Sequence, residues 1–187
     1  MTTRQLTEDV AIYLGESLAT GCESSESPFP DLEMRVALLA PGMMADLLME
    51  EGCNGVRGGK TLGGELVADS EGTASIVLPD DFMKLQSLLV TGWKMPVTEV
   101  SPSDPELLAR LRSRWSAVRA TSLNPVVTEE RDASGRRILR IFGCKPGARL
   151  ERCCYMPYPT LANIGELELP GNLYLKLLKM LAEVVGV

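Results

Sequence analysis

Histidine is absent from this 187-residue sequence, and aromatic residues make up only 5% of it. Without histidine, the chain cannot build a Ser-His-Asp triad, a Cys-His pair, a His-ligated zinc site or a histidine pH switch. The scarcity of aromatic side chains argues against a stacking platform for single-stranded nucleic acid. We therefore expect no catalytic residue, no metal site and no cofactor, and function has to be inferred from charge and from a local resemblance.

A long uninterrupted apolar run is also missing. The longest apolar stretch, residues 173–187, is interrupted by Lys176, Lys179 and Glu183. A helix that spans a bilayer needs about 20 largely apolar residues. The N-terminus turns acidic at once and lacks the apolar core of a signal peptide. We therefore expect a protein that folds in a cytoplasm and has no membrane partner.

The cysteines show no spacing typical of a metal site or a redox pair, because no Cys-x-x-Cys motif occurs. Their odd number and the lack of a secretion signal predict free thiols. Cys153 and Cys154 are adjacent, so in a strand their side chains would point to opposite faces. Small apolar core residues are one interpretation; a reactive thiol whose pKa is lowered by Arg149 and Arg152 is the other. The five cysteines are Cys22, Cys53, Cys144, Cys153 and Cys154.

Charge is distributed unevenly along the chain. Residues 1–81 carry 4 basic and 15 acidic side chains, whereas residues 110–152 carry 11 basic and 4 acidic ones. Such polarity can steer self-association, with the acidic part of one molecule meeting the basic part of a neighbour. Alternatively, both regions are solvated or neutralise each other within one fold. The candidate residues for contact with a partner or DNA are Arg110, Arg112, Arg114, Arg136, Arg137 and Arg140.

Helical periodicity marks the N-terminal part of the chain. Thr2 and Gln5 fit a capping box at the start of a first helix, and Gly21 is the expected end of that helix. A second helix is predicted over residues 31–51. Pro41 lies inside it and removes a backbone donor, which favours a kink or a break at that point.

A last helix is predicted from Pro170 onward. Its polar residues Lys176, Lys179 and Glu183 form one thin stripe, and apolar side chains cover the rest. A helix that is apolar on most sides should be buried on most sides. We therefore expect this helix to be central to the core or to be completed by another subunit.

The middle of the chain predicts β-hairpins. Residues 65–68 and 73–78 flank an Asp-Ser-Glu-Gly turn, and residues 125–130 and 136–142 flank an Asp-Ala-Ser-Gly turn. Residues 149–156 are expected to form a third strand beside the second hairpin.

Together these elements predict a single α+β domain over residues 1–187. Its helical part comprises residues 1–51 and 170–187, and its β-rich part comprises residues 63–156 with an inserted helix near residues 105–119. The C-terminal apolar helix is expected to pack in a helical bundle.

A local resemblance rests on three segments in a fixed order. The segments are Ile76-Val77-Leu78-Pro79-Asp80-Asp81-Phe82-Met83-Lys84-Leu85, Trp93-Lys94-Met95-Pro96-Val97 and Tyr155-Met156-Pro157-Tyr158-Pro159. Together they resemble the head–tail connector (neck or adaptor) proteins of tailed bacteriophages, especially phage-derived sequences of gut bacteria, over about residues 30–187. We expect Pro79 to end a strand, Phe82 and Leu85 to fill the core, and Trp93 to cover a sheet face.

The resemblance implies a virion structural protein without catalysis, which assembles as a homo-oligomeric ring beneath the portal. It also implies a helical bundle with a β insertion. The implied partners are the portal and tail proteins, with transient contact to passing DNA. The implied location is the host bacterial cytoplasm during assembly and the virion neck afterwards. No individual residue carries over as a portal or DNA ligand, because the matching residues are expected to determine the fold.

Two other functions stay open. Asp80-Asp81 could supply paired carboxylates, and Cys153 or Cys154 a nucleophile, for a thiol- or carboxylate-dependent enzyme; adjacent acids in a loop, however, usually cap a turn. An accessory nucleic-acid-binding protein would use the basic middle segment, whose arginines can contact phosphates. An overall excess of 25 acidic over 19 basic residues argues against a dedicated nucleic-acid binder.

Overall fold

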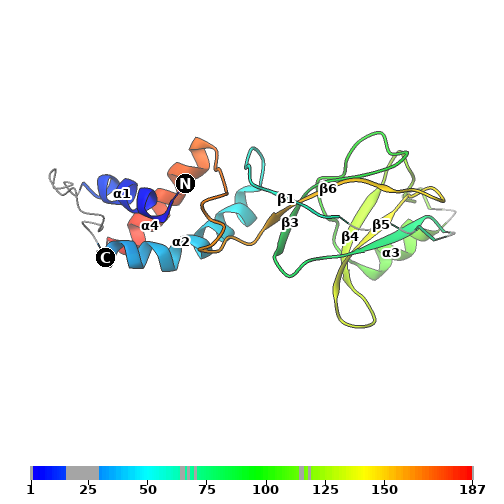
Figure 1. Ribbon diagram of the computed structural model, residues 1–187. Coiled ribbons are helices and arrows are strands. Elements are labelled where there is room, and N and C mark those ends of the chain that lie inside the picture. The colour runs from blue at the N-terminus through cyan, green and yellow to red at the C-terminus, as the bar shows by residue number, and fades with distance from the viewer. Residues whose placement is uncertain are drawn as a thin grey trace. The chain divides into compact units, whose positions relative to one another are not determined.

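The computed structural model describes residues 2–15, 30–63, 66, 68, 69, 71–113, 116, 117 and 119–186. Within these residues the chain has four helices and two antiparallel sheets, which confirms the predicted α+β class (Figure 1). The chain divides into two compact units. Residues 1–59 and 158–187 form the helical unit, and Lys60–Pro157 form the β unit. Along the sequence, the β unit is therefore inserted into the helical unit.

The helices of the helical unit are α1 (Thr3–Tyr13), α2 (Pro30–Glu51) and α4 (Gly171–Val185). The side chain of Thr2 caps α1, because its Oγ1 accepts a hydrogen bond from the backbone N–H of Gln5 at 3.2 Å. α1 ends at Tyr13. The predicted continuation to Gly21 falls largely on residues 16–29, outside the described part of the chain.

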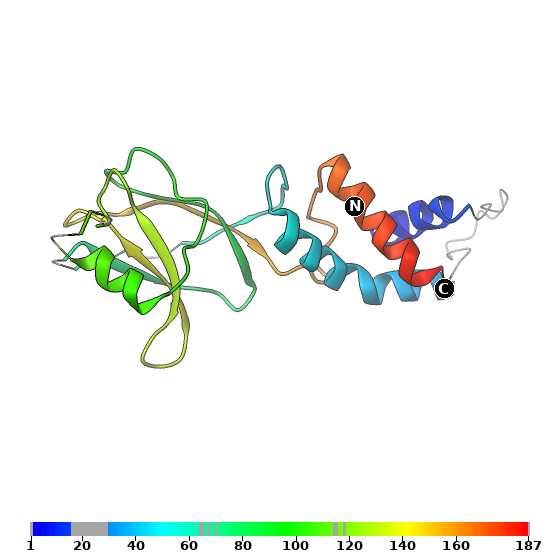
Figure 2. The ribbon, with the colours of Figure 1, turned by 180° about the vertical axis from the view of Figure 1, so that it is seen from behind.

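Pro41 lies inside α2, which continues without a break from Pro30 to Glu51. Proline removes one backbone hydrogen bond and displaces the preceding turn, so a bend is expected there. Figure 2 shows such a bend near the middle of α2. The helix is not interrupted, because Val36 before the proline and Met44 after it are both completely buried in the same unit. The sequence predicted either a kink or a break at Pro41, and the structure has a kink.

α4 packs against both α1 and α2. Its Leu177 and Leu181 are completely buried, so the helix fills the centre of this unit. Its outer surface is also apolar in part, because Leu175 is 61% exposed and Val184 is 45% exposed. Burial thus covers one face of α4. The sequence predicted burial on most of its sides, and that prediction is wrong. No helix in the described residues has both the length and the apolar composition needed to cross a bilayer.

The β unit contains two three-stranded sheets. The first has the order β2 (Thr73–Val77), β5 (Arg137–Phe142) and β4 (Val126–Arg131). The second has the order β1 (Lys60–Thr61), β6 (Leu150–Pro157) and β3 (Phe82–Val90). β4 and β5 pair in register from Val126–Phe142 to Arg131–Arg137, which confirms the second predicted hairpin.

Two of the predicted strand pairings are wrong. β2 pairs with β5 rather than with residues 65–68. In that segment Leu66 and Ala68 lie outside any strand, and Glu65 and Val67 fall outside the described residues. β6 pairs with β1 and β3 in the second sheet rather than with the hairpin. A local pattern specifies which face of a strand is buried, whereas the neighbouring strand is chosen by contacts that are distant in sequence.

The two sheets share one hydrophobic core. Leu139 of the first sheet and Leu88 of the second are both completely buried in it. The residues that carry the connector resemblance lie where the sequence predicted, because Phe82 (1% exposed), Leu85 (2%) and Trp93 (8%) belong to this core. They act as fold determinants.

α3 (Pro105–Arg112) lies in the β unit and is shorter than the predicted helix over residues 105–119. Its start is as expected, with Pro105 in the first turn and the Asp104 carboxylate accepting a hydrogen bond from the N–H of Glu106 at 3.1 Å. It ends because Ser113 takes an extended conformation, with φ −66° and ψ 126°.

Replacing Leu177 by alanine should destabilise the helical unit by about 2–5 kcal/mol, because the removed side chain leaves a cavity between three helices. Leu175→Ala on the same helix is the matched control, since an exposed leucine contributes within about 0.5 kcal/mol. Urea unfolding followed by far-UV circular dichroism measures both variants. Equal effects of the two substitutions would contradict the packing of α4.

Candidate functional site

The arginines predicted to contact a partner are mostly engaged within the β unit. Four of the six form ion pairs with carboxylates, and Arg114 lies outside the described residues. A guanidinium held by a neighbouring carboxylate presents little net positive charge to a phosphate. Of the predicted set, Arg112 is left without an acidic partner among the described residues. The four pairs are Arg110–Glu106, Arg136–Asp132 (2.8 Å), Arg137–Glu129 (2.7 Å) and Arg140–Glu130 (3.4 Å).

Arg137 has a structural role. Its Nε donates to Glu129 on β4, and its Nη1 donates to the backbone carbonyl of Phe82 at 3.1 Å. The guanidinium carbon also lies 5.6 Å from the centre of the Phe82 ring. β4 and β5 belong to one sheet and β3 to the other, so this side chain connects the two sheets. Arg137 therefore helps to hold the two sheets together.

Gly143 is the point at which the loops at one end of the β unit meet. Its φ of +86° is one that glycine adopts freely, and a Cβ here would lie 2.5 Å from the carbonyl oxygen of Thr121. The indole N–H of Trp93 donates to the Gly143 carbonyl at 3.2 Å, and the N–H of Cys144 donates to the Gly72 carbonyl at 2.9 Å. We name this region the loop end. It comprises residues 71–73, 91–95, 119–124 and 143–149, with Arg112 at the end of α3.

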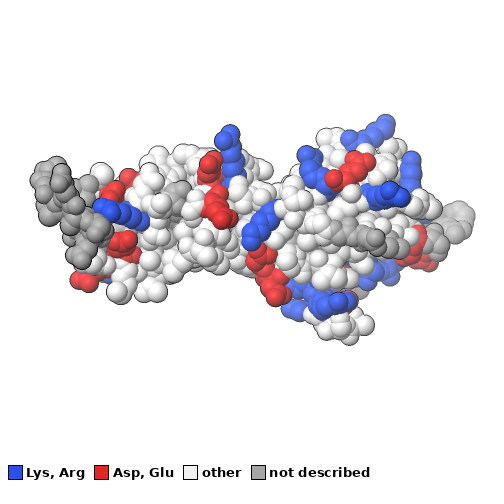
Figure 3. Space-filling view, in the orientation of Figure 1, with Lys and Arg blue, Asp and Glu red and all other residues white. Residues whose placement is uncertain are grey.

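Five basic side chains of the loop end are exposed and form no ion pair with a described residue. Glu71 is the single acidic residue among those that define the loop end. Figure 3 shows basic side chains along the upper side of the part that holds the strands, with acidic side chains among them, and further basic side chains on its lower side. The five residues are Lys94, Arg112, Arg119, Lys145 and Arg149.

Sequence reasoning missed four of these five residues. Counting charges along the chain cannot distinguish an arginine that faces a carboxylate from one that faces solvent. The available signal was the position of Lys94 and Lys145 in turns that contain Gly92 and Gly147, because such turns project from the ends of sheets. Which of these turns meet in space depends on the strand order, and that order was not predicted.

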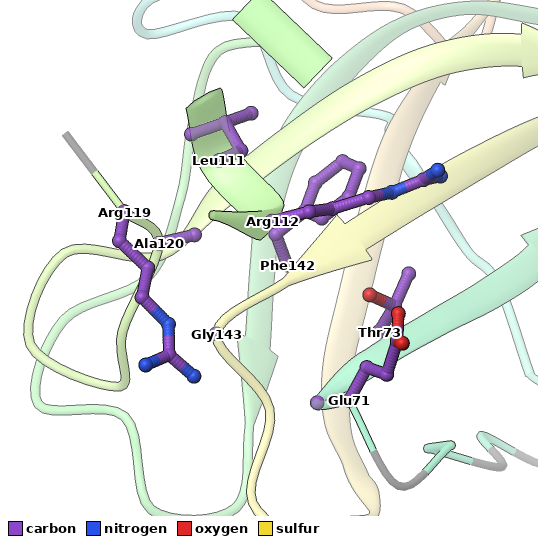
Figure 4. A pocket seen from close by; sticks show the side chains of 9 residues that line it. Glu71, Thr73, Leu111, Arg112, Arg119, Ala120, Phe142 and Gly143 are labelled. Atoms are coloured by element: carbon purple, nitrogen blue, oxygen red, sulfur yellow. The ribbon is translucent and has the colours of Figure 1, made fainter. Parts of the chain in front are cut away.

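A shallow hollow opens on the surface of the loop end. The ring of Phe142 lines it, with the guanidinium carbon of Arg112 5.8 Å from the ring centre. Figure 4 shows the side chains of Arg112 and Arg119 on different sides of the hollow, and those of Glu71 and Thr73 beside it. Small-molecule pockets measure about 300–1,000 Å³ and enclose their ligands. The hollow at the loop end is shallow and open to solvent, so it is not a pocket of this kind.

Asp81, one of the two adjacent acids considered for catalysis, is held by structural contacts. Its carboxylate accepts hydrogen bonds from the Lys60 ammonium at 2.7 Å and from the Tyr155 hydroxyl at 2.9 Å. The hydrogen bond from Lys60 is the main cause that lowers the pKa of Asp81, so the carboxylate stays ionised and joins β1 and β6 to the start of β3. Across the residues with described positions, no three Cys, Asp or Glu side chains form a group that could hold a metal ion.

The cysteines in the described part of the chain are free thiols, as predicted, and Cys22 lies outside that part. Cys153 is completely buried and Cys154 is half-buried, in agreement with side chains on opposite faces of β6. Burial raises the pKa of Cys153 to about 11 and that of Cys144 to about 11. Both thiols stay protonated at neutral pH and behave as small apolar core residues.

No protein-family model matches this chain, and a search among curated proteins finds no significantly similar sequence. The resemblance to connector proteins thus rests on the three sequence segments that carry it.

In the native protein, Cys153 and Cys144 should react with iodoacetamide far more slowly than Cys154. The thiolate is the reactive form, and at about pH 8 a thiol whose pKa is about 11 is ionised to roughly one part in a thousand. Labelling of the two buried thiols should rise as the pH approaches their pKa, and also on unfolding in urea, which removes the burial. Timed labelling followed by peptide mass spectrometry measures each site. Fast labelling of native Cys153 near neutral pH would instead support the reactive thiol.

Proposed function

We propose that this chain is a non-enzymatic structural protein of a phage or prophage particle, a head–tail connector or adaptor that forms a ring below the portal. The observation that carries the proposal is the division of charge between the two units. The helical unit has 13 acidic and 5 basic side chains, whereas the β unit has 14 basic and 12 acidic ones. The unpaired basic groups are concentrated at the loop end. Opposite charge on separate units suits contact between successive copies of one chain.

The architecture supports the same proposal. Connector proteins, which the sequence resembles, combine a helical bundle with a β insertion, and here Lys60–Pro157 is inserted between α2 and α4. The segments that carry the resemblance are part of this framework, since Phe82, Leu85 and Trp93 belong to the β core.

Ring assembly requires that the two sides of each copy differ and fit each other. Such heterologous contacts close into a ring when the rotation between neighbours permits it, and otherwise extend into a filament. Complementary charge accelerates encounter and disfavours like-charged contacts. The proposed partners are further copies, the portal and the tail proteins, with DNA only in passing. Assembly would take place in the cytoplasm of the host bacterium, and the finished ring would form part of the virion neck.

Mixed with the portal protein of the same genome, the chain should bind to one end of the portal as a ring of regular copy number. The portal acts as a template that raises the effective concentration of neighbouring copies. Electron microscopy of the mixture measures this, with each protein alone as the control. Chain and portal that stay separate at both low and physiological salt would overturn the proposal, as would turnover of a metabolite by the purified chain.

The loop end also favours a second function, as an accessory protein that binds nucleic acid. The loop end has five basic side chains without an ion pair to a described residue, and Glu71 is the one acidic residue among those that define it. Basic groups that contact phosphates displace counterions, so the affinity would fall steeply with salt. The acidic helical unit would oppose such binding, and for this reason we place this function second.

If the second function holds, Lys145→Gln combined with Arg149→Gln should lower the affinity for double-stranded DNA by about tenfold at low salt. Arg110→Gln combined with Arg136→Gln lowers the net charge equally and is the matched control, because both arginines are paired with carboxylates. Fluorescence anisotropy at several salt concentrations measures both variants. Equal losses for the two variants, or no binding by the unmodified chain, would rule out a DNA site at the loop end.

A further inference from the structure

α2 has two apolar faces, and only one of them is buried in the helical unit. The second face is exposed, since Met34 is 65%, Leu38 73% and Met49 54% accessible. Pro41 and Ala45 follow the same helical spacing, so the five residues form one stripe about 22 Å long. A single exposed leucine needs no explanation, whereas several apolar side chains along one face mark an interaction surface. We name these five residues the α2 stripe.

Acidic side chains border the α2 stripe on the side away from the core. Asp46 and Glu50 are exposed, and each directly follows a residue of the stripe in sequence. Neither forms an ion pair with a residue that the structure describes. The single basic residue of α2, Arg35, donates to the Val184 carbonyl at 3.3 Å. The border of the α2 stripe thus carries Asp46 and Glu50 in the second half of the helix, and the exposed Arg35 next to Met34 in the first half. Its net charge is negative.

The loop end has the complementary composition. Met95 is 74% exposed and Leu123 is 72% exposed, more than any other large apolar side chain that the structure describes in the β unit. Both project from loops that adjoin Gly143, one through Trp93 and the other through Thr121. The five basic side chains of the loop end lie in the same loops or next to them. This surface thus offers two apolar tips with a positive border.

We propose that the loop end of one copy binds the α2 stripe of a second copy of this chain. The inference rests on the proposed function and names the two surfaces that would join neighbouring subunits. Met95 and Leu123 would contact the stripe, and the basic groups would face Asp46 and Glu50.

Charge makes this contact heterologous. Two α2 stripes facing each other would bring four unpaired carboxylates and two arginines together, a net negative charge, and two loop ends would bring ten unpaired cations together. Like charges placed opposite each other across an interface are disfavoured. A contact between a loop end and an α2 stripe avoids both repulsions. Two copies joined in this way still have one free loop end and one free α2 stripe. Association of copies can therefore continue until a ring closes.

Two variants that each break one surface test this inference. Leu38→Glu disrupts the α2 stripe and leaves the loop end intact, while Leu123→Glu does the reverse. Each variant alone should be monomeric under conditions in which the unmodified chain associates, with dissociation constants raised about tenfold or more. An equimolar mixture of the two should form a dimer and nothing larger, because only one intact surface of each kind is then available. Sedimentation velocity measures the species, and circular dichroism verifies that both variants are folded.

The controls are Leu175→Glu on α4 and Val77→Glu on β2, which place the same charge at exposed apolar positions outside the two surfaces. Both should associate like the unmodified chain, and association should weaken as salt rises. A mixture of Leu38→Glu and Leu123→Glu chains that stays monomeric would overturn the inference, as would a Leu123→Glu variant that self-associates normally. An unmodified chain that stays monomeric at about 1 mM, whether or not it binds DNA, would also overturn it. Binding to the portal is measured separately, so the proposed function can stand if this interface fails.

Discussion

The close approach of the loops at Gly143 positions every group that we assign to the loop end. Any other residue at this position would bring a Cβ to 2.5 Å from the Thr121 carbonyl oxygen, and the backbone there has a positive φ. The bond from the Trp93 indole to the Gly143 carbonyl then ties the loop that carries Lys94 and Met95 to the loop that carries Lys145. A buried aromatic residue and a glycine thus determine where exposed charges lie. The functional surface is a consequence of packing beneath it.

The sequence predicted where several helices and strands begin, but it did not predict which strands pair with one another. Thr2, Pro105 and the Asp132 turn have side chains that fix local conformation, so the starts of α1 and α3 and the hairpin of β4 and β5 could be predicted. The partner of β6 could not be, because strand pairing depends on residues far apart in the chain. The same reason explains why the ion pairs of the arginines could not be predicted. Arg137 follows a basic neighbour in sequence, yet in space it faces Glu129 and the ring of Phe82.

The two units use their apolar residues differently. In the β unit, apolar residues from both sheets fill one shared core, and Met95 and Leu123 are the largest exceptions. In the helical unit, α2 is apolar on two faces although three helices can bury only one of them. An exposed stripe of this kind risks unspecific aggregation. The acidic residues along its border reduce that risk, because they repel a second stripe and admit a basic partner.

The position of the β unit in the sequence has a consequence for synthesis. α4 covers the buried faces of α1 and α2, yet the ribosome completes Lys60–Pro157 before it makes α4. The end of α2 at Glu51 precedes the end of α4 at Val185 by about 130 residues. At about 5–20 residues per second, roughly 7–27 s therefore pass in which α1 is the one helix available to cover α2. During this interval the nascent chain is a natural client for a chaperone that binds apolar segments. A truncated chain would never acquire a folded helical unit, so unfinished products would be excluded from an assembling particle.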